Sequence, residues 1–178
     1  YDIATIAAMT KTRISILIPV HNESENLEWH HKKMVQTLKK HALVYEFIYV
    51  DDGSTDESAT IIKKISSHND NVDYVLFSRN FGKEAAITAG LRKASGEIVL
   101  IIDADGQHPI EMLDEFIDKW KDGYEMVIGI RRSNKGEGFI KSIGSRLFYR
   151  LLRSVDNGRE IVPGSTDFRL LDRKVVDQ

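Results

Sequence analysis

The sequence alternates short apolar runs, rich in Val and Ile, with longer segments in which apolar residues recur every three or four positions. Runs that are apolar at successive positions are typical of strands buried on both faces, and the intervening periodicity is typical of amphipathic helices. We therefore expect an α/β fold with a mostly parallel central sheet flanked by helices. The predicted strands cover residues 13–19, 44–50, 72–77, 97–102 and 124–130, and a last apolar run covers 168–171.

Four helices are expected between the predicted strands and one after them. Helical periodicity and polar cap residues place these helices at about 24–40, 56–67, 82–94, 109–123 and 139–154. Residues 1–12 carry no helix or strand pattern, which predicts a disordered or vector-derived leader before a single domain over 13–178.

The composition excludes several classes of function. The 178 residues contain no cysteine, which rules out disulfides, zinc–thiolate sites, iron–sulfur clusters and a thiol nucleophile. The net charge of -2 does not fit a nucleic-acid-binding protein, so no nucleic-acid partner is expected. No apolar run approaches the roughly 20 residues of a membrane-spanning helix.

Polar side chains follow each predicted strand at the point where it ends. Because ligands bind outside the carboxyl ends of the strands in an open parallel sheet, these side chains predict one binding site along a single edge. In chain order the strand-end clusters contain Pro19, His21 and Glu23, then Asp51 and Asp52, then Arg79 and Lys83, then Asp103, Asp105 and Gln107, and finally Arg131 and Arg132.

The sharpest of these clusters is the segment DADGQ at 103–107, which follows an apolar run. Two carboxylates two residues apart can bind one hard divalent cation, and the side-chain carbonyl of Gln107 offers a further oxygen ligand. In isolation the same residues would only cap a helix and form a turn. The other acidic residues at this edge favour the metal site, with Asp103, Asp105 and Gln107 as its ligands.

The remaining clusters each admit two interpretations. The acidic pair after the second strand binds loop amides, or one carboxylate accepts the imide N–H of uracil or guanine, for which Asp52 is preferred. Lys83 follows Gly82 at a predicted helix start, where a cation and backbone amides suit a phosphate, although a solvated lysine is equally ordinary there. His30 and His31 lie in a polar helix pattern and are expected at the surface.

Five motifs occur in order along most of the chain from Arg13 onward. They are PVHNESENL at 19–27, VDDGSTD at 50–56, SRNFGKEAAITAGL at 78–91, DADGQHP at 103–109 and STDFRLLDRKVVD at 165–177. Together they resemble the GT-A-fold glycosyltransferases. More narrowly, they are similar to the polyprenyl-phosphate glycosyltransferases, relatives of dolichol-phosphate mannose synthase and of the bacterial bactoprenol glucosyltransferases.

The resemblance implies a binding site for a nucleotide-sugar donor. Asp103, Asp105 and Gln107 would hold the diphosphate through Mg2+ or Mn2+. His21 stands where the dolichol enzymes often carry tyrosine, and this departure leaves the identity of the nucleotide open. A UDP-sugar is favoured, with GDP-mannose as the alternative. The residues implied to line the nucleoside pocket are Pro19, His21, Glu23, Val50, Asp52 and Ala104.

The resemblance also implies an acceptor side, in which Lys83, Arg131 and Arg169 would bind phosphate or acceptor groups. Asp167 falls where such enzymes carry the candidate catalytic base. The implied reaction is an inverting transfer to polyprenyl phosphate at the cytoplasmic face of the cell membrane. A lipid phosphate with a second pKa of about 6 scarcely needs deprotonation at neutral pH. Asp167 therefore acts as a base, orients the acceptor or stabilises an oxocarbenium-like centre.

Two other functions stay open. One is a related GT-A enzyme that glycosylates a saccharide hydroxyl, for which a true base at Asp167 would be essential. The other is a non-enzymatic phosphorylation switch of the receiver type, built on Asp51, Asp52 and Asp103.

The predicted helix Phe139–Ser154 places basic side chains between apolar positions. It is interpreted either as a core-facing helix with a solvated basic side or as an interfacial helix on an anionic membrane. The family resemblance further predicts that the domain is truncated before C-terminal membrane segments. Self-association into a homo-oligomer is compatible with the sequence.

Overall fold

The structure is a computed structural model that describes residues 12–41, 43–130 and 165–178, with the backbone alone for 165–167. The chain divides into two compact units, one comprising Tyr1–Val127 with Phe168–Gln178 and the other Ile128–Asp167. The predicted leader at 1–12, apart from Thr12, and the predicted helix Phe139–Ser154 lie outside the described residues.

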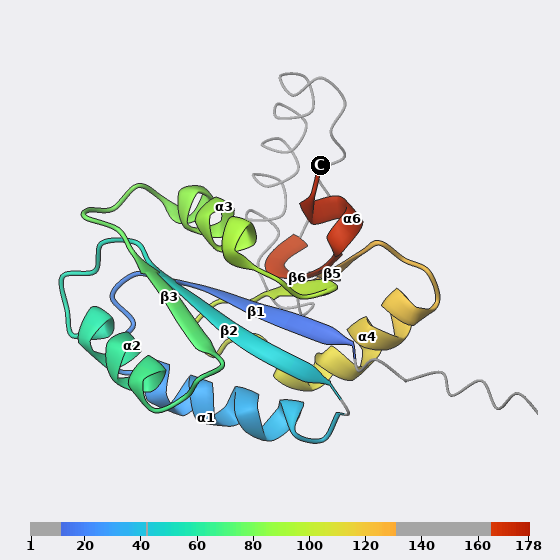
Figure 1. Cartoon of the computed structure of the whole chain (residues 1–178), viewed down its shortest axis with the longest axis horizontal. Coiled ribbons are helices and arrows are strands. Elements are labelled where there is room, and N and C mark those ends of the chain that lie inside the picture. Colours follow the sequence, from blue (N-terminus) through green and yellow to red (C-terminus); the bar gives the residue numbers. More distant parts are fainter. Residues whose placement is uncertain (1–11, 42, 131–164) are drawn as a thin grey trace, which may run out of the picture. The chain divides into compact units, whose positions relative to one another are not determined.

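A six-stranded sheet, with strand order β3-β2-β1-β4-β6-β5, forms the centre of the fold (Figure 1). Strand β1 pairs in parallel with β2 and β4, β2 pairs in parallel with β3, and β6 runs antiparallel to β4. The predicted mostly parallel sheet is therefore confirmed. The strands are β1 Arg13–Val20, β2 Val44–Asp51, β3 Val72–Leu76, β4 Ile98–Ile101, β5 Met126–Ile130 and β6 Ser165–Asp172.

The register of the parallel strands brings their carboxyl ends to one edge. Val20 at the end of β1 pairs with Asp51 at the end of β2, and Asp51 pairs with Leu76 at the end of β3. Leu17 pairs with Ile101, the last residue of β4. The loops that follow these four strands therefore start side by side, as the sequence predicted.

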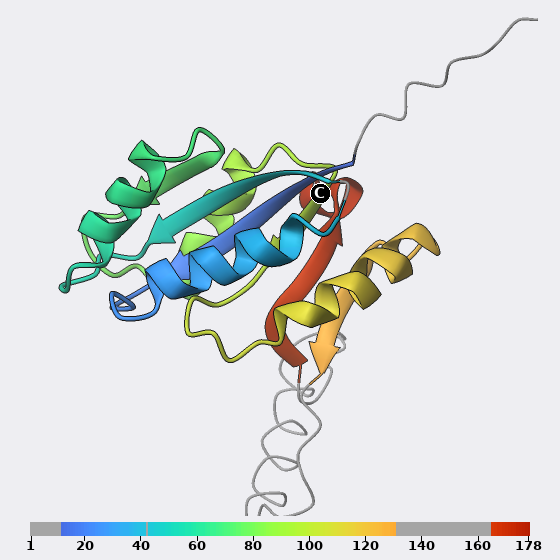
Figure 2. The ribbon, with the colours of Figure 1, turned by 90° about the horizontal axis from the view of Figure 1, so that it is seen from below.

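Helices cover both faces of this sheet (Figures 1 and 2). One layer contains α1 Leu27–Leu38, α2 Ser58–Ser67 and α4 Leu113–Lys121, which is preceded by the short 3-10 helix η1 Ile110–Met112. The opposite layer contains α3 Lys83–Lys93 and α6 Arg173–Val176. None of the helices in the described segments is both long enough and apolar enough to cross a bilayer.

The buried side chains of β1 show why the predicted strand is apolar at successive positions. Ile14, Ile16 and Ile18 pack with the α1, α2 and α4 layer, whereas Leu17 packs with α3 on the other face. A strand covered on both faces must be apolar at both parities, because neighbouring side chains point to opposite faces.

Two residues of α1, His30 and His31, contradict the sequence prediction because both are buried. His31 Nδ1 lies 2.9 Å from the hydroxyl oxygen of Tyr49 on β2. Only 3% of His30 is exposed, and its Nδ1 has no hydrogen-bond partner among the described residues. Burial lowers the pKa of His30 to about 4 and also lowers the pKa of His31. The polar pattern of α1 gave a wrong prediction because these two imidazoles belong to the inner face of the helix.

Gly53, in the loop after β2, joins two loops of the sheet edge. Its φ of 65° lies in the left-handed region, and a Cβ placed on it would collide with the backbone of Arg79 in the loop after β3. Only glycine satisfies both the backbone conformation and the close approach. The glycine of the VDDGSTD motif thus fixes the distance between the two loops.

We expect Gly53→Ala to lower the free energy of unfolding by more than about 2 kcal/mol, because the new methyl group must displace backbone atoms. Gly123→Ala is the matched control, since Gly123 also has a positive φ, 98°, but no atom of the described residues lies within 4 Å of the place that its Cβ would take. The control should lose only the strain of the left-handed conformation, about 1 kcal/mol. Urea denaturation of both variants tests this, and equal losses would contradict the packing argument.

His30 should make folding stability depend on pH. Its pKa in the folded chain is lowered from the ordinary 6.5 to about 4, so the unfolded chain binds the proton first and stability falls as pH drops through this window. Between about pH 7 and about pH 5 the loss attributable to His30 is about 2 kcal/mol. His30→Gln should remove this part of the pH dependence when unfolding is measured with a chelator present. His68→Gln, which removes an exposed imidazole, should leave the part of the pH dependence that comes from His30 unchanged.

Candidate functional site

A pocket of about 190 Å³ lies at the carboxyl edge of the sheet. Its walls come from the ends of β1, β2 and β4 and from the first turn of α3, which are the places that sequence analysis singled out. Val20 and Ala86 are the lining residues that sequence analysis did not name, since neither side chain carries a chemical signal. The lining residues are Pro19, Val20, His21, Glu23, Asp52, Lys83, Ala86, Asp103, Ala104 and Asp105.

His21 forms one end of the pocket, and both of its ring nitrogens contact the protein. Nδ1 lies 2.9 Å from the backbone oxygen of Asp52, which can only accept, so Nδ1 carries the proton. Nε2 is then the acceptor for the side-chain amide of Asn80, at 3.2 Å. The hydrogen bonds fix the orientation of the ring, and its exposed face is what remains to meet a ligand.

Asp52 ties the end of β2 to the start of α3. Its Oδ1 accepts the backbone N–H of Phe81 at 2.7 Å, and its Oδ2 accepts the N–H of Gly82 at 2.9 Å. The interpretation of this carboxylate as a partner of loop amides therefore applies to Asp52. Each carboxylate oxygen has a further lone pair, so Asp52 can still accept a hydrogen bond from a ligand in the pocket that it lines.

Asp51 is the more deeply buried member of the pair, at 2% exposure. Its Oδ2 receives one long hydrogen bond, 3.3 Å, from the N–H of Ser54, and within the described part of the chain its Oδ1 has no hydrogen-bond partner. Asp51 does not line the pocket.

Asn22 connects the loop after β1 to the loop after β2. It adopts a left-handed φ of 57°, which asparagine tolerates better than most residues. Its N–H donates to Ser54 Oγ at 2.9 Å, and its Oδ1 accepts the N–H of Thr55 at 2.8 Å. The first loop therefore receives its shape from the second, which is why α1 begins at Leu27 and not near residue 24 as predicted.

A second set of bonds extends this connection. The N–H of Glu23 donates to Ser58 Oγ, and the N–H of Ser24 donates to Asp56 Oδ2. Asp56 Oδ1 also accepts the N–H of Ser58 at the start of α2. Asp56 is exposed, and although slight desolvation raises its pKa, the hydrogen bonds from Ser58 and Ser24 outweigh this effect and hold the pKa well below its usual range. The pocket is thus shaped by hydrogen bonds between loops before any ligand binds.

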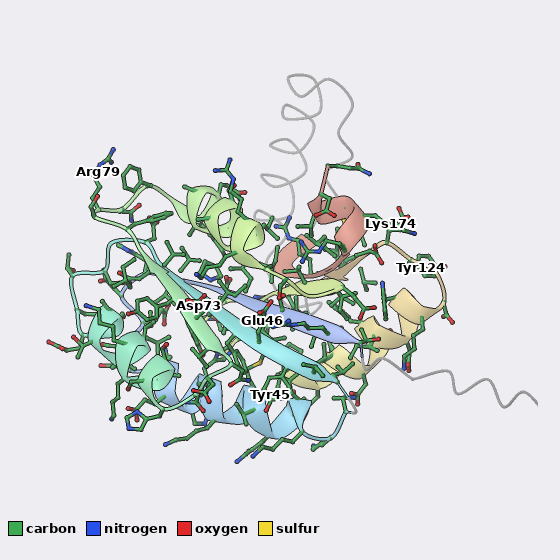
Figure 3. All side chains as sticks on the ribbon, in the orientation of Figure 1. Tyr45, Glu46, Asp73, Arg79, Tyr124 and Lys174 are labelled. Atoms are coloured by element: carbon green, nitrogen blue, oxygen red, sulfur yellow. The ribbon has the colours of Figure 1, made fainter. Side chains whose placement is uncertain are left out.

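The loop after β3 closes this side of the site. Its tip carries Arg79, which points away from the sheet (Figure 3). The Arg79 guanidinium lies 4.1 Å from the centre of the exposed Phe81 ring. The Phe77 ring packs edge-on against the Phe81 ring, with 5.4 Å between the two ring centres. The tip of the loop is therefore packed in place beside the backbone amides that Asp52 binds.

The carboxylates Asp103 and Asp105 form the other end of the pocket. Lys83 Nζ lies 2.6 Å from Asp103 Oδ1, and His108 Nε2 lies 3.6 Å from Asp103 Oδ2. Asp105 Oδ1 accepts the N–H of Gln107 at 2.9 Å, which forms the turn that sequence analysis offered as the alternative to a metal site. The turn and the orientation of both carboxylates toward the pocket coexist.

Gly106 lets this turn pack against α1. Its φ is 68°, and a Cβ placed on it would lie 2.7 Å from the ring of Trp29. The half-exposed indole of Trp29 thus supports the loop that carries both carboxylates.

The carboxylate pair fits a divalent cation that arrives with additional oxygen ligands. Asp103 and Asp105 are partly exposed and face a shared pocket, which suits a hard cation. Among the residues that the structure describes, no three His, Asp or Glu side chains gather closely enough to hold a metal ion by themselves. The remaining coordination positions would have to come from water or from a ligand such as a diphosphate.

Several predicted site residues do not line the pocket. Val50 is completely buried in the core beneath α3. Gln107 is exposed, and it contributes its backbone N–H to the turn. Arg169 lies on β6, opposite Ile101 in the register. Asp167 is described only as a backbone position in β6, and Arg131 lies outside the described residues.

Comparison with known proteins places this geometry in a family. Residues 15–178 match the family model of glycosyl transferase family 2. The uncharacterized glycosyltransferase YkcC of Bacillus subtilis is 41% identical over 164 residues, which make up 92% of this chain and 50% of that protein. The prophage bactoprenol glucosyl transferase homolog of Escherichia coli is 34% identical over 165 residues, 93% of this chain and 54% of that protein. The chain spans about half the length of the curated relatives that it matches.

Solved structures share the fold. Glucosyl-3-phosphoglycerate synthase from Mycobacterium tuberculosis, in complex with Mn2+, UDP and glucosyl-3-phosphoglycerate, superposes with a TM-score of 0.64 at 22% identity, over 92% of this chain and 58% of that chain. The mannosyltransferase PcManGT from Pyrobaculum calidifontis, in complex with GDP-Man and Mn2+, gives a TM-score of 0.61 at 22% identity, over 95% of this chain and 47% of that chain. The predicted GT-A fold is confirmed, and with the match over residues 15–178 the chain belongs to glycosyl transferase family 2.

Proposed function

We propose that this chain transfers a sugar, with inversion, from a nucleotide-sugar to a polyprenyl phosphate. One observation carries the donor half of the proposal: a single pocket joins an oriented imidazole and Asp52 at one end to a carboxylate pair and a lysine at the other. A nucleoside diphosphate has the matching order, with a base at one end and anionic oxygens at the other. The relatives named bactoprenol glucosyl transferase support a polyprenyl phosphate acceptor.

The nucleoside would bind at the His21 end of the pocket. Since both ring nitrogens of His21 have protein partners, the imidazole would contact the base through its face, and Asp52 would accept an N–H from the edge of the base. Pro19, Glu23 and Ala104 would complete the walls. Val50 would act only through the backbone beside the acidic pair, because its side chain is buried in the core.

The diphosphate would bind at the other end. Asp103 and Asp105 would hold Mg2+ or Mn2+, with Gln107 shaping their turn, and such an ion stabilises the negative charge that develops on a leaving phosphate. Lys83 reaches the same place from the first turn of α3 and would bind a phosphate oxygen. The Mn2+ in the complexes of structural neighbours supports the choice of ion.

The acceptor would attack from the face opposite the leaving group, which inverts the anomeric centre. A dianionic phosphate is already a competent nucleophile, so Asp167 would orient the acceptor and would not need to remove a proton. Arg131 and Arg169 would bind the acceptor phosphate. The predicted basic helix over Phe139–Ser154 would bind the anionic membrane at the cytoplasmic face.

The two other functions considered from the sequence are less well supported. A saccharide acceptor would need a general base, and no observation in the described residues favours one. Membership of a glycosyltransferase family excludes the receiver-type switch, and the acidic pair follows β2, not the first strand that such a switch requires.

The donor site can be tested by thermal shift with a panel of UDP-sugars and GDP-sugars, each with and without Mn2+. The correct donor at about 100 times its Kd should stabilise the chain by about 2.7 kcal/mol, and only with the metal. Asp103→Asn should abolish this shift. The control is Asp73→Asn, which removes a carboxylate of β3 (labelled in Figure 3) that pairs with Lys93 and does not line the pocket. No metal-dependent shift with any donor would count against the proposal.

The acceptor class can be tested by the pH dependence of turnover. With a polyprenyl phosphate acceptor, the rate should fall below about pH 6 as the phosphate takes up its second proton. Asp167→Asn should lower the rate but keep the same pH profile, because no proton is removed by this residue. If the variant instead lost the acidic limb of the profile, or if a saccharide hydroxyl replaced the lipid phosphate as acceptor, the polyprenyl phosphate assignment would be wrong.

A further inference from the structure

One carboxylate of the pocket, that of Asp103, already pairs with a cation of the protein itself, the ammonium group of Lys83. Lys83 Nζ lies 2.6 Å from Asp103 Oδ1, with 38% of the lysine side chain and 23% of the aspartate side chain exposed. Both side chains line the pocket together with Asp105. An ammonium group therefore lies against an oxygen that a divalent cation would also bind.

The backbone of Lys83 is firmly placed, so any change of partner must come from its side chain. The preceding N–H groups of Phe81 and Gly82 donate to the two oxygens of Asp52, and Gly82 N–H also lies 2.9 Å from Asn80 Oδ1. These bonds fix the start of α3. The four-carbon stem of a lysine can nevertheless move its ammonium group among several positions.

We infer that Lys83 is an internal counter-ion that competes with a divalent cation for Asp103 and moves onto the donor's diphosphate when metal and nucleotide bind together. The inference rests on the proposed function and deepens it. It assigns Lys83 two successive partners, Asp103 in the ligand-free chain and a phosphate oxygen in the complex.

The charges explain why metal and diphosphate would bind cooperatively. A bare divalent cation must either displace the ammonium group or share Asp103 with a like charge only a few ångströms away. A nucleoside diphosphate supplies anionic oxygens that can accept hydrogen bonds from the Lys83 ammonium group and can complete the coordination of the metal. Each ligand therefore favours binding of the other by the same factor, as linkage requires.

The other groups around the carboxylates do not take the place of Lys83. His108 approaches the opposite oxygen, Asp103 Oδ2, at 3.6 Å, and Gln107 contributes only an uncharged backbone N–H to Asp105. Burial lowers the pKa of His30 to about 4 and outweighs the opposite effect of Asp105 and Asp103, so His30 is neutral at neutral pH. Among the described residues, Lys83 supplies the one ammonium group within 4 Å of the pair.

The test is calorimetric titration of Lys83→Met with MnCl2 alone, and then with UDP and with GDP at saturating Mn2+. Removing the competing charge should tighten the binding of bare Mn2+ roughly tenfold. Removing the phosphate partner should weaken nucleotide binding in Mn2+ by a similar factor of roughly ten. The two opposite changes distinguish this role from a structural one, in which both affinities would fall together.

Lys93→Met is the matched control. Lys93 lies on the same helix, pairs with Asp73 and is 37% exposed, but it does not line the pocket. Its loss should change neither affinity. Lys83→Arg keeps the charge and should bind bare Mn2+ like the wild type. Lys83→Gln also removes the charge, and it replaces the methionine variant if that variant does not fold.

Unchanged or weaker binding of bare Mn2+ by Lys83→Met would overturn the counter-ion inference, even if the wild type binds UDP or GDP in a Mn2+-dependent way as the proposed function requires. If the wild type binds neither nucleotide, the proposed donor site is wrong. Tighter Mn2+ binding by Lys83→Met would then still support competition for Asp103.

Discussion

The hydrogen bonds made by Asp52 are the interactions on which the rest of the site depends. By accepting the N–H groups of Phe81 and Gly82, it joins the end of β2 to the start of α3, and its backbone oxygen orients His21. The first turn of α3 in turn places Lys83 against Asp103. One buried residue therefore helps to align both ends of the pocket, His21 through its backbone oxygen and the start of α3 through its carboxylate.

The parts that sequence analysis predicted well share a physical cause. A strand covered on both faces must be apolar throughout, and a parallel sheet must collect its carboxyl ends at one edge, so the strands and the position of the pocket follow from the residue pattern. Pro19, His21, Glu23 and Asp52 indeed meet Lys83, Asp103, Ala104 and Asp105 around one pocket. The family motifs added roles to these residues but were not needed to place the edge.

The parts that the sequence did not predict depend on contacts between distant segments. The burial of His30 and His31 is set by how α1 packs on the sheet, which a polar helix pattern does not reveal. The late start of α1 reflects bonds from Asn22 to a loop more than 30 residues away. Likewise, nothing in the local pattern of Lys83 distinguishes a solvated lysine from one paired with Asp103 across the pocket.

The contact between Trp29 and Gly106 has a consequence of another kind. The chain has two tryptophans, and the second, Trp120, is held in α4 by a hydrogen bond to Asp172. The half-exposed indole of Trp29, by contrast, rests on the turn between Asp105 and Gln107. A rearrangement of that turn would change the polarity around this ring, so the fluorescence of Trp29 would report movement of the loop that carries the carboxylate pair.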